Sequence, residues 1–479
     1  MNLLMLVIVP AIGALCLVAR PLRPRAATAL VVCALASLVL ALHFASEPPR
    51  SIESPARRFL ALDIMSRIFL VVVEAVFFTV AVYVRSRVAS TPALRPQIPR
   101  FSALALAFLA ASNAVLVSAH LTAAWIALEA TTFAAAPLIV RPGSPSSTRA
   151  SFRYMVFSSV GLGLAFLGLL CFERGAEASG IAASFDAAGL SELGSHASNA
   201  WMKLGLSLTI LGLGTKLGLA PMYAWLPEVY DEAPPAVAAL LSAVQFNCAL
   251  VMLLRVIQAF RPALPGLIMG QLLTMGIVSM AVSTISIIGT RNMKRLVAYA
   301  SINHAGVIAI GLGLGKGASF GLLIYVLSNA FIKAVLFLTA GKIKAHYGTK
   351  DTGQIAGLIK DLPYSGVFLM VGTFALLGFP PFGSFVGELL ILSALVGSGE
   401  VLVFAAFCVL MAMTFVATGR TIFPMIWGAP KKPRSWPRQT FVSAAPKLLL
   451  LACLVVLGVY VPPSINGMLQ EVATSLDAS

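Results

Sequence analysis

Long apolar segments recur along the whole chain and restrict it to one class of fold. Of its 479 residues, 59% are hydrophobic and only 11% are charged, and the mean hydropathy is +0.93. About fourteen apolar segments of roughly 20 residues are each long enough to cross a bilayer as an α-helix. They are centred near residues 11, 36, 75, 110, 131, 161, 213, 246, 277, 305, 329, 380, 413 and 456. The sequence therefore predicts an all-α, polytopic membrane protein with almost no soluble domain.

Basic residues gather in alternate loops between these segments. They follow the first, third, fifth, ninth, eleventh and thirteenth segments, for example at Arg85 and Arg87, at Lys294 and Arg295, and at Lys431 and Lys432. Such loops face the cytoplasm, so we expect both termini on the non-cytoplasmic side of the cell inner membrane. The net charge of +16 then reports topology, and nucleic-acid binding is not expected. The first segment lacks a basic start and a cleavage site, so we interpret it as a retained span.

The sequence contains no recognisable cofactor or metal motif. Its six cysteines are scattered through apolar segments and form no C-x-x-C pair or Cys/His cluster. We find no dinucleotide-binding glycine pattern and no P-loop. We therefore expect this chain to bind no cofactor and no metal, so that any redox centre would belong to partner subunits.

Two segments place an ionisable residue beside a helix break. In the first, Lys216 precedes Pro221, and in the second, Pro380 and Pro381 precede Glu388. A charge at mid-bilayer costs about 2.5–3.5 kcal/mol and is usually functional, and transporters build ion sites where helices are interrupted. The segments lie about five spans apart, and this odd offset predicts an inverted repeat.

Further ionisable residues lie deep in other apolar segments. Glu129 is expected to pair with Lys216, as a proton switch or as a structural ion pair. His304 can pass a proton near neutral pH or serve only in packing. Lys333 lies at mid-span. We favour a proton relay along the membrane midplane through Glu129, Lys216, His304, Lys333 and Glu388.

Other polar residues could support such a relay. Asn329 precedes Lys333 by one helical turn, and Lys294 lies at the cytoplasmic end of the segment that contains His304. Glu228, Asp231 and Glu232 follow Lys216; they could collect protons at an entrance or belong to an ordinary loop. For Glu74 we expect a structural pair with Arg67 and no chemical role.

At these residues the chain resembles the antiporter-like subunits shared by respiratory complex I, Mrp-type sodium/proton antiporters and group 4 membrane-bound hydrogenases. The matching motifs are WIALE (125–129), TKLGLAPMYAWLPEVYDEAPPAVAALLS (215–242), MKRLVAYASINHAG (293–306), SNAFIKAVLFLTAG (328–341) and GFPPFGSFVGE (378–388). The resemblance covers roughly residues 60–430, and its details look most like hydrogenase-4 component F.

The resemblance implies two inverted five-helix repeats, with the seventh and twelfth helices interrupted. It divides the chain into N-terminal helices (1–100), a first repeat (101–260), a second repeat (261–430) and a basic loop with the last helix (431–479). The family's glutamate–lysine pair corresponds to Glu129 and Lys216, and its later relay residues to Lys333 and Glu388. Asn247 lies where relatives often carry a lysine or histidine, and Asn329 where they often carry a histidine.

The resemblance favours a proton-translocating subunit of a multisubunit membrane oxidoreductase, driven by redox partner subunits. Three alternatives remain open. The chain could belong to an Mrp-type cation/proton antiporter, or it could energise inorganic carbon uptake with a large soluble partner. It could also be a scaffold whose relay is degenerate, which Asn247 and Asn329 would favour.

Overall fold

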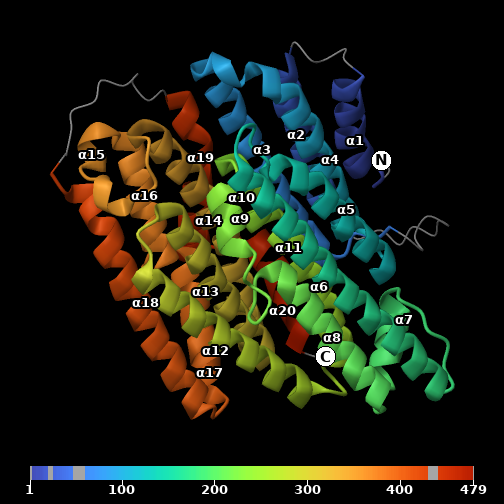
Figure 1. The fold of residues 1–479 in the computed structure, drawn as a ribbon. Coiled ribbons are helices and arrows are strands. Elements are labelled where there is room, and N and C mark those ends of the chain that lie inside the picture. Colours follow the sequence, from blue (N-terminus) through green and yellow to red (C-terminus); the bar gives the residue numbers. More distant parts are fainter. Residues whose placement is uncertain (1–2, 20–24, 47–59, 430–440, 478–479) are drawn as a thin grey trace. The chain divides into compact units, whose positions relative to one another are not determined.

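The computed structural model describes residues 3–19, 25–46, 60–429 and 441–477, which are almost entirely helical (Figure 1). Its α-helices are α1 (Met5–Val18), α2 (Ala26–Ser46), α3 (Ile64–Ser90), α4 (Ile98–Val117), α5 (Leu121–Ile139), α6 (Pro145–Ala178), α7 (Ala187–Ser195), α8 (Ala200–Leu217), α9 (Leu226–Glu232), α10 (Pro235–Ala239), α11 (Phe246–Phe260), α12 (Pro265–Gly289), α13 (Met293–Leu314), α14 (Ser319–Tyr347), α15 (Leu358–Asp361), α16 (Pro363–Leu376), α17 (Gly383–Gly397), α18 (Val401–Trp427), α19 (Phe441–Val459) and α20 (Pro463–Asp477). Two 3-10 helices, η3 (Pro92–Gln97) and η5 (Thr352–Gln354), and a π-helical turn, η4 (Leu240–Gln245), complete the helical elements.

The apolar helices confirm the prediction of an all-helical chain built from membrane-spanning segments. Within the described ranges, ten helices are long and apolar enough to cross a membrane, or up to eleven if the bent pair α19–α20 counts as one span. Three further apolar helices, α1, α16 and α17, are shorter. The prediction of about fourteen spans depends on how these short helices combine, so it stays a prediction.

The chain divides into two compact units that interleave in the sequence. The first comprises Met1–Leu217, Val244–Gln271 and Gln470–Ser479, and the second comprises Gly218–Ala243 and Leu272–Leu469. Each unit holds part of the predicted relay, and each is described separately below.

Glycines let two helices of the first unit pack closely. Gly161 and Gly168 on α6 face Gly205 and Gly212 on α8. A Cβ at Gly212 would lie 2.5 Å from the Gly161 carbonyl oxygen and from the Ala165 nitrogen, both backbone atoms that have no way to rotate aside. Small residues allow membrane helices to approach in this way without a hydrophobic driving force. This packing places α8 directly against the α6 side chains that form the site below.

Helix breaks mark the second unit. Residues 218–225 lie between α8 and α9, and residues 377–382 lie between α16 and α17; neither stretch is α-helical. Gly218 and Gly378 adopt positive φ values of 76° and 67°, a conformation that side chains with a Cβ rarely adopt. Each break also contains a cis X-Pro bond, Ala220–Pro221 in one and Pro380–Pro381 in the other.

The core of the second unit is α14. The most apolar 18-residue stretch of this helix is fully buried, whereas only 17% of the corresponding stretch of α18 is buried. When other helices surround a helix, its polar and charged side chains contact protein and not lipid. Lys333, on α14, is therefore surrounded by protein.

Candidate functional site

Lys216 lies in the last turn of α8 and is 3% exposed. Its Nζ donates a hydrogen bond to the Thr132 hydroxyl on α5 and lies 5.4 Å from the centroid of the Tyr154 ring. The Thr132 hydroxyl is also 3.4 Å from Oε2 of Glu129, one turn earlier on α5. One hydroxyl thus accepts from the lysine and donates to the carboxylate, so it bridges the two groups.

Two other side chains complete the surroundings of Glu129 and Lys216. Ser159 on α6 donates a hydrogen bond of 2.6 Å to Oε1 of Glu129. Gln245, at the end of the π-turn η4, donates to Thr131 at 2.9 Å and accepts from the Tyr154 hydroxyl at 2.8 Å. The wider π-turn re-aims a side chain within an otherwise regular helix, and such turns are frequent at functional sites. The result is a polar network inside an apolar bundle.

The geometry of this first cluster differs in one respect from the expected ion pair. Among the residues that the structure describes, no direct ion pair joins Glu129 to Lys216; Thr132 lies between them. Asn247, 1% exposed on α11, lies two residues beyond Gln245, and Gln245 supplies the amide of the network. A bridging hydroxyl can transfer a proton by accepting on one side and donating on the other.

A second cluster forms around His304 on α13, which is 3% exposed. Its Nε2 lies 3.0 Å from the carbonyl oxygen of Leu376, the last residue of α16. A carbonyl only accepts, so Nε2 carries the hydrogen. The Tyr325 hydroxyl, on α14, lies 2.9 Å from Nδ1 and donates to it while the ring is neutral. The two rings stack with centroids 5.3 Å apart.

The helix break explains why His304 finds a free carbonyl there. The last carbonyls of a helix have no intrahelical partner. At the end of α16, His304 satisfies the Leu376 oxygen, and the Ser384 hydroxyl on α17 donates to Ala375 at 2.6 Å. The end of α16 at the break therefore offers a free carbonyl oxygen that holds the titratable imidazole of His304 in place.

Lys333 and Glu388 lie on the helices that carry or pack against Tyr325. Lys333, 1% exposed, follows Tyr325 by about two turns on α14. Glu388, half-buried on α17, comes directly after Gly387, where a Cβ would lie 2.7 Å from the Cβ of Tyr325. Oε2 of Glu388 has no hydrogen-bond partner among the described residues. Gly378 is close to this oxygen, since a Cβ there would lie 2.5 Å from it. The second unit thus brings four groups together: Lys333, His304, Tyr325 and Glu388.

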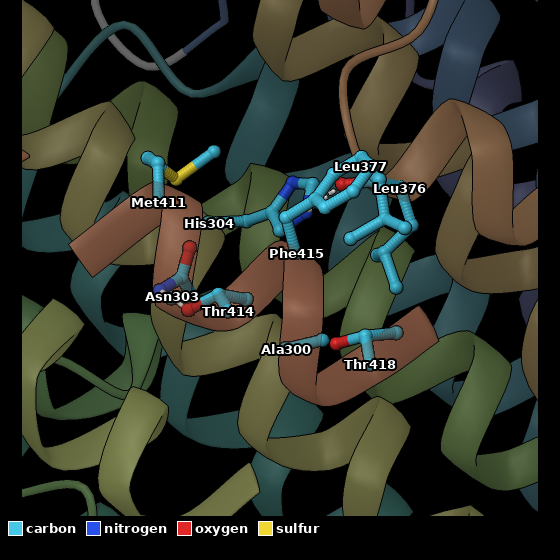
Figure 2. A pocket seen from close by; sticks show the side chains of 9 residues that line it. All are labelled: Ala300, Asn303, His304, Leu376, Leu377, Met411, Thr414, Phe415 and Thr418. Carbon is cyan, nitrogen blue, oxygen red and sulfur yellow. Dashed lines mark hydrogen bonds between the residues drawn. The ribbon is translucent and has the colours of Figure 1, made fainter. Parts of the chain in front are cut away.

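Polar atoms in the same unit lack protein partners. Both side-chain polar atoms of Asn329 and the hydroxyl of Ser328 have none within the described ranges, and these residues are 1% and 0% exposed. A cavity of about 10 Å³ lies beside His304 and Asn303 and is also lined by Thr414 and Thr418. Figure 2 shows the side chains that line it. That volume accommodates about one water molecule. A water there would lie beside the imidazole and the polar side chains of α13 and α18.

The supporting residues Lys294, Asp231 and Glu232 form a network at the end of α9. Asp231, 2% exposed, accepts from Asn292 at 3.0 Å, from Arg295 at 3.1 Å and from Lys350 at 2.6 Å. Lys294 donates to the carbonyl oxygens of Asp231 and Ala233, and Lys350 also reaches Glu232 at 3.3 Å. These contacts anchor the segment that follows the first helix break. Glu228 lies earlier on α9.

Removing Asp231 should destabilise this anchor. We expect Asp231→Ala to lower the free energy of unfolding by about 2 kcal/mol, less than for a fully buried pair because Arg295 is 47% and Lys350 25% exposed. Thermal unfolding in detergent would measure the loss. Glu173→Ala, an exposed carboxylate on α6, is the matched control and should change little. Equal stability of the two variants would contradict the anchoring role.

Sequence patterns missed several residues of these clusters. Thr132, Ser159 and Tyr154 contact Glu129 or Lys216, Gln245 contacts Tyr154, and Tyr325 contacts His304. A signal existed for Thr132, which lies one turn after Glu129 on the same helix face. For the others, only tertiary packing brings the hydroxyl or amide to the charge. Among the described residues, no three or more His, Cys, Asp or Glu side chains are grouped so that they could hold a metal ion.

Solved structures share this arrangement of helices. The membrane-bound sulfane sulfur reductase, an archaeal respiratory complex, contains a chain that matches with a TM-score of 0.86 at 23% identity, covering 98% of this chain and 97% of that one. A chain of the Mrp complex from Dietzia sp. DQ12-45-1b gives 0.85 at 20% identity, with 99% and 97% covered. At these identities the likeness shows the fold.

Sequence relatives support the same conclusion. A hydrogenase-4 component F homologue of Methylacidiphilum infernorum is 28% identical over 453 residues, 91% of each chain. The NADH-quinone oxidoreductase subunit N of Chlorobium chlorochromatii is 30% identical over 274 residues, 54% of this chain and 52% of that one. These relatives and structural neighbours are named as parts of multisubunit membrane complexes. Residues 118–414 match the family model described as "NADH:quinone oxidoreductase/Mrp antiporter, TM". The chain is a multi-span membrane protein that belongs to this family of antiporter-like subunits.

Proposed function

We propose that the chain is the proton-translocating subunit of a multisubunit membrane oxidoreductase of hydrogenase-4 or complex I type. The chain itself would hold no redox centre, and partner subunits would supply the reaction energy. The observation that carries the proposal is the second cluster, where the Tyr325 hydroxyl contacts His304, Lys333 follows Tyr325 on α14, and Glu388 comes directly after Gly387, which packs against Tyr325. Intramembrane ionisable groups in such a series are typical of proton relays.

The chemistry of each cluster suits proton transfer. In the first unit, a change at Glu129 would alter the interaction that holds Lys216 charged, with Thr132 as the bridge. In the second, His304 holds a proton on Nε2 and accepts at Nδ1. Protonation at Nδ1 would reverse the Tyr325 hydrogen bond, because imidazolium only donates. A charge change at Lys333 would thus be felt at Tyr325 and passed toward Glu388.

The architecture expected from the sequence belongs to the same proposal. It comprises about fourteen spans, two inverted five-helix repeats with the seventh and twelfth helices interrupted, and the inner membrane as location with both termini on the non-cytoplasmic side. The proposed repeats are residues 101–260 and 261–430, flanked by 1–100 and 431–479. Glycine-containing breaks with similar local sequence, at 218–221 and 378–381, support equivalent positions in two repeats.

Glu388→Gln tests the relay directly. We expect proton translocation by the reconstituted complex to fall about tenfold or more, because the amide is similar in shape but holds no exchangeable acid proton. The redox reaction, measured with an uncoupler present, should persist. Glu400→Gln, at an exposed carboxylate just after α17, is the matched control. Equal translocation by both variants would refute the assignment of Glu388.

The nature of the complex needs a separate experiment. Tagged chain would be purified from native membranes in mild detergent, and its partners identified by mass spectrometry. Hydrogenase-like and iron–sulfur subunits would support the proposal. Other antiporter subunits without redox proteins would replace it with cation/proton exchange, which the fold shared with an Mrp complex makes the second candidate. A single large soluble partner would indicate energised uptake.

A further inference from the structure

Glu74 lies outside the matched part of the family, on α3, and its side chain is fully buried. Its Oε1 accepts a hydrogen bond of 2.7 Å from Nδ2 of Asn113 on α4. The same amide nitrogen donates at 2.8 Å to the carbonyl oxygen of Leu6 on α1. One amide therefore joins a carboxyl group to a backbone carbonyl, and three helices of the first unit meet there.

The sequence of α1 explains why that carbonyl needs a donor. Pro10 lies four residues after Leu6 inside the helix and has no N–H to donate. The Leu6 oxygen loses its intrahelical partner, and Asn113 replaces it. This site thus places an ionisable group beside a proline-disrupted helix, as Lys216 and Glu388 lie beside theirs. Here the carboxyl group, the amide and the free carbonyl come from three separate helices, α3, α4 and α1.

The hydrogen bonding of the Glu74–Asn113 pair is incomplete. Within the described ranges, Oε2 of Glu74 and Oδ1 of Asn113 accept no hydrogen bond from the protein, although both residues are 0% exposed. A buried polar atom without a partner is costly, so each of these two oxygens calls for a hydrogen-bond donor.

Nearby cations do not neutralise the carboxyl group. The structure gives Glu74 no ion pair in its described part, and Arg67, the partner expected from the sequence, donates to the Leu62 carbonyl instead. Of the titratable groups on the helices packed against α3, Arg255 on α11 binds Asp63 and Ser66. The others are Cys33 and His43 on α2, Arg95 on η3, Arg100 on α4 and Cys248 on α11. The expected pairing with Arg67 is therefore wrong, and the carboxyl group lies in an apolar environment.

We propose that Glu74 and Asn113 form a proton-exchange site in the N-terminal helices, and this inference rests on the proton-translocating function proposed above. Glu74 holds the proton as a carboxylic acid. On release, the Oε2–H bond breaks and the proton passes to a water molecule that accepts the hydrogen bond from Oε2, and this water hands a proton on to further water. The Asn113 N–H then stabilises the carboxylate, and the reverse step reloads it. The site adds a proton-binding group that the relay of the matched region lacks.

Two substitutions separate proton exchange from packing. Glu74→Gln keeps the size of the side chain and an oxygen for the Asn113 hydrogen bond, but it has no acid proton. We expect it to lower proton translocation by the reconstituted complex about tenfold, with Glu74→Asp retaining most of the rate. The redox rate with uncoupler and the thermal unfolding temperature should stay unchanged in both. Normal translocation in Glu74→Gln would overturn the inference.

A parallel variant and a second measurement separate failure of the Glu74 site from failure of the proposed function. If Lys216→Ala also translocates normally, the proposed function fails; if it does not and Glu74→Gln does, only the present inference fails. Should the Glu74 variants not assemble, the unmutated complex would be treated with dicyclohexylcarbodiimide, which adds to protonated carboxyl groups in apolar surroundings. Mass spectrometry of the Glu74 peptide should show modification that falls as the pH rises. Protection by sodium at constant pH, or no modification at any pH, would overturn the assignment.

Discussion

Lys216→Ala should abolish proton translocation by the complex, with a decrease of about 100-fold or more, while electron transfer to artificial acceptors survives. The substitution removes the ammonium group that donates to the Thr132 hydroxyl. Glu129, which accepts from the same hydroxyl, then has no positive charge linked to it. Alanine also removes the cation that lies 5.4 Å from the centroid of the Tyr154 ring. Proton uptake into vesicles and the uncoupled redox rate would measure the two effects.

Lys203 provides the control for this experiment. It lies on the same helix, α8, and is exposed, so Lys203→Ala removes one positive charge without touching the cluster. We expect it to translocate protons normally. Undiminished translocation in Lys216→Ala would refute the relay. An intermediate loss in Thr132→Val would show that the bridging hydroxyl transmits the charge.

Gly212→Val should have the largest effect on folding. Its Cβ would lie 2.5 Å from backbone atoms of α6, which have no rotamer to adopt, so the two helices must separate. Overpacking of this kind costs about 3 kcal/mol or more when backbone must move. We expect a lower unfolding temperature and loss of translocation together, because separation of α8 from α6 withdraws Lys216 from the site.

A second glycine distinguishes crowding from the intrinsic effect of valine in a helix. Gly163, on α6, has no atom within 4 Å of the position of a Cβ, so Gly163→Val adds the same side chain without a clash. Unfolding temperature by size-exclusion chromatography after heating would compare the two. Similar stability in both variants would show that the close approach of α6 and α8 is not required.

Hydropathy and charge were enough to predict an all-helical membrane protein. Apolar segments of about 20 residues leave a chain no other way to satisfy its backbone in lipid. Proline near Lys216 and Glu388 predicted breaks at positions where the helices do end, since proline lacks the N–H that continues a helix. These are local properties, and the local sequence encodes them.

The hydrogen-bond partners of the ionisable side chains were harder to predict. The sequence paired Glu74 with Arg67 on the same helix, whereas the structure gives it Asn113 from α4. Thr132 lies between Glu129 and Lys216, and the Leu376 carbonyl binds His304 across 72 residues of sequence. Such contacts depend on the relative orientation and distance of packed helices. The sequence of one helix does not determine these.

The sequence by itself determined the class of fold, the segments that can cross the membrane and the buried positions of Lys216, His304 and Lys333, because hydropathy and helix breaking act within one segment. The tertiary structure alone decided which hydroxyl, amide or carbonyl meets each of these groups. The physical reason is that burying a charge is costly in every packing arrangement, whereas the groups that offset the cost come from whichever helices lie beside it.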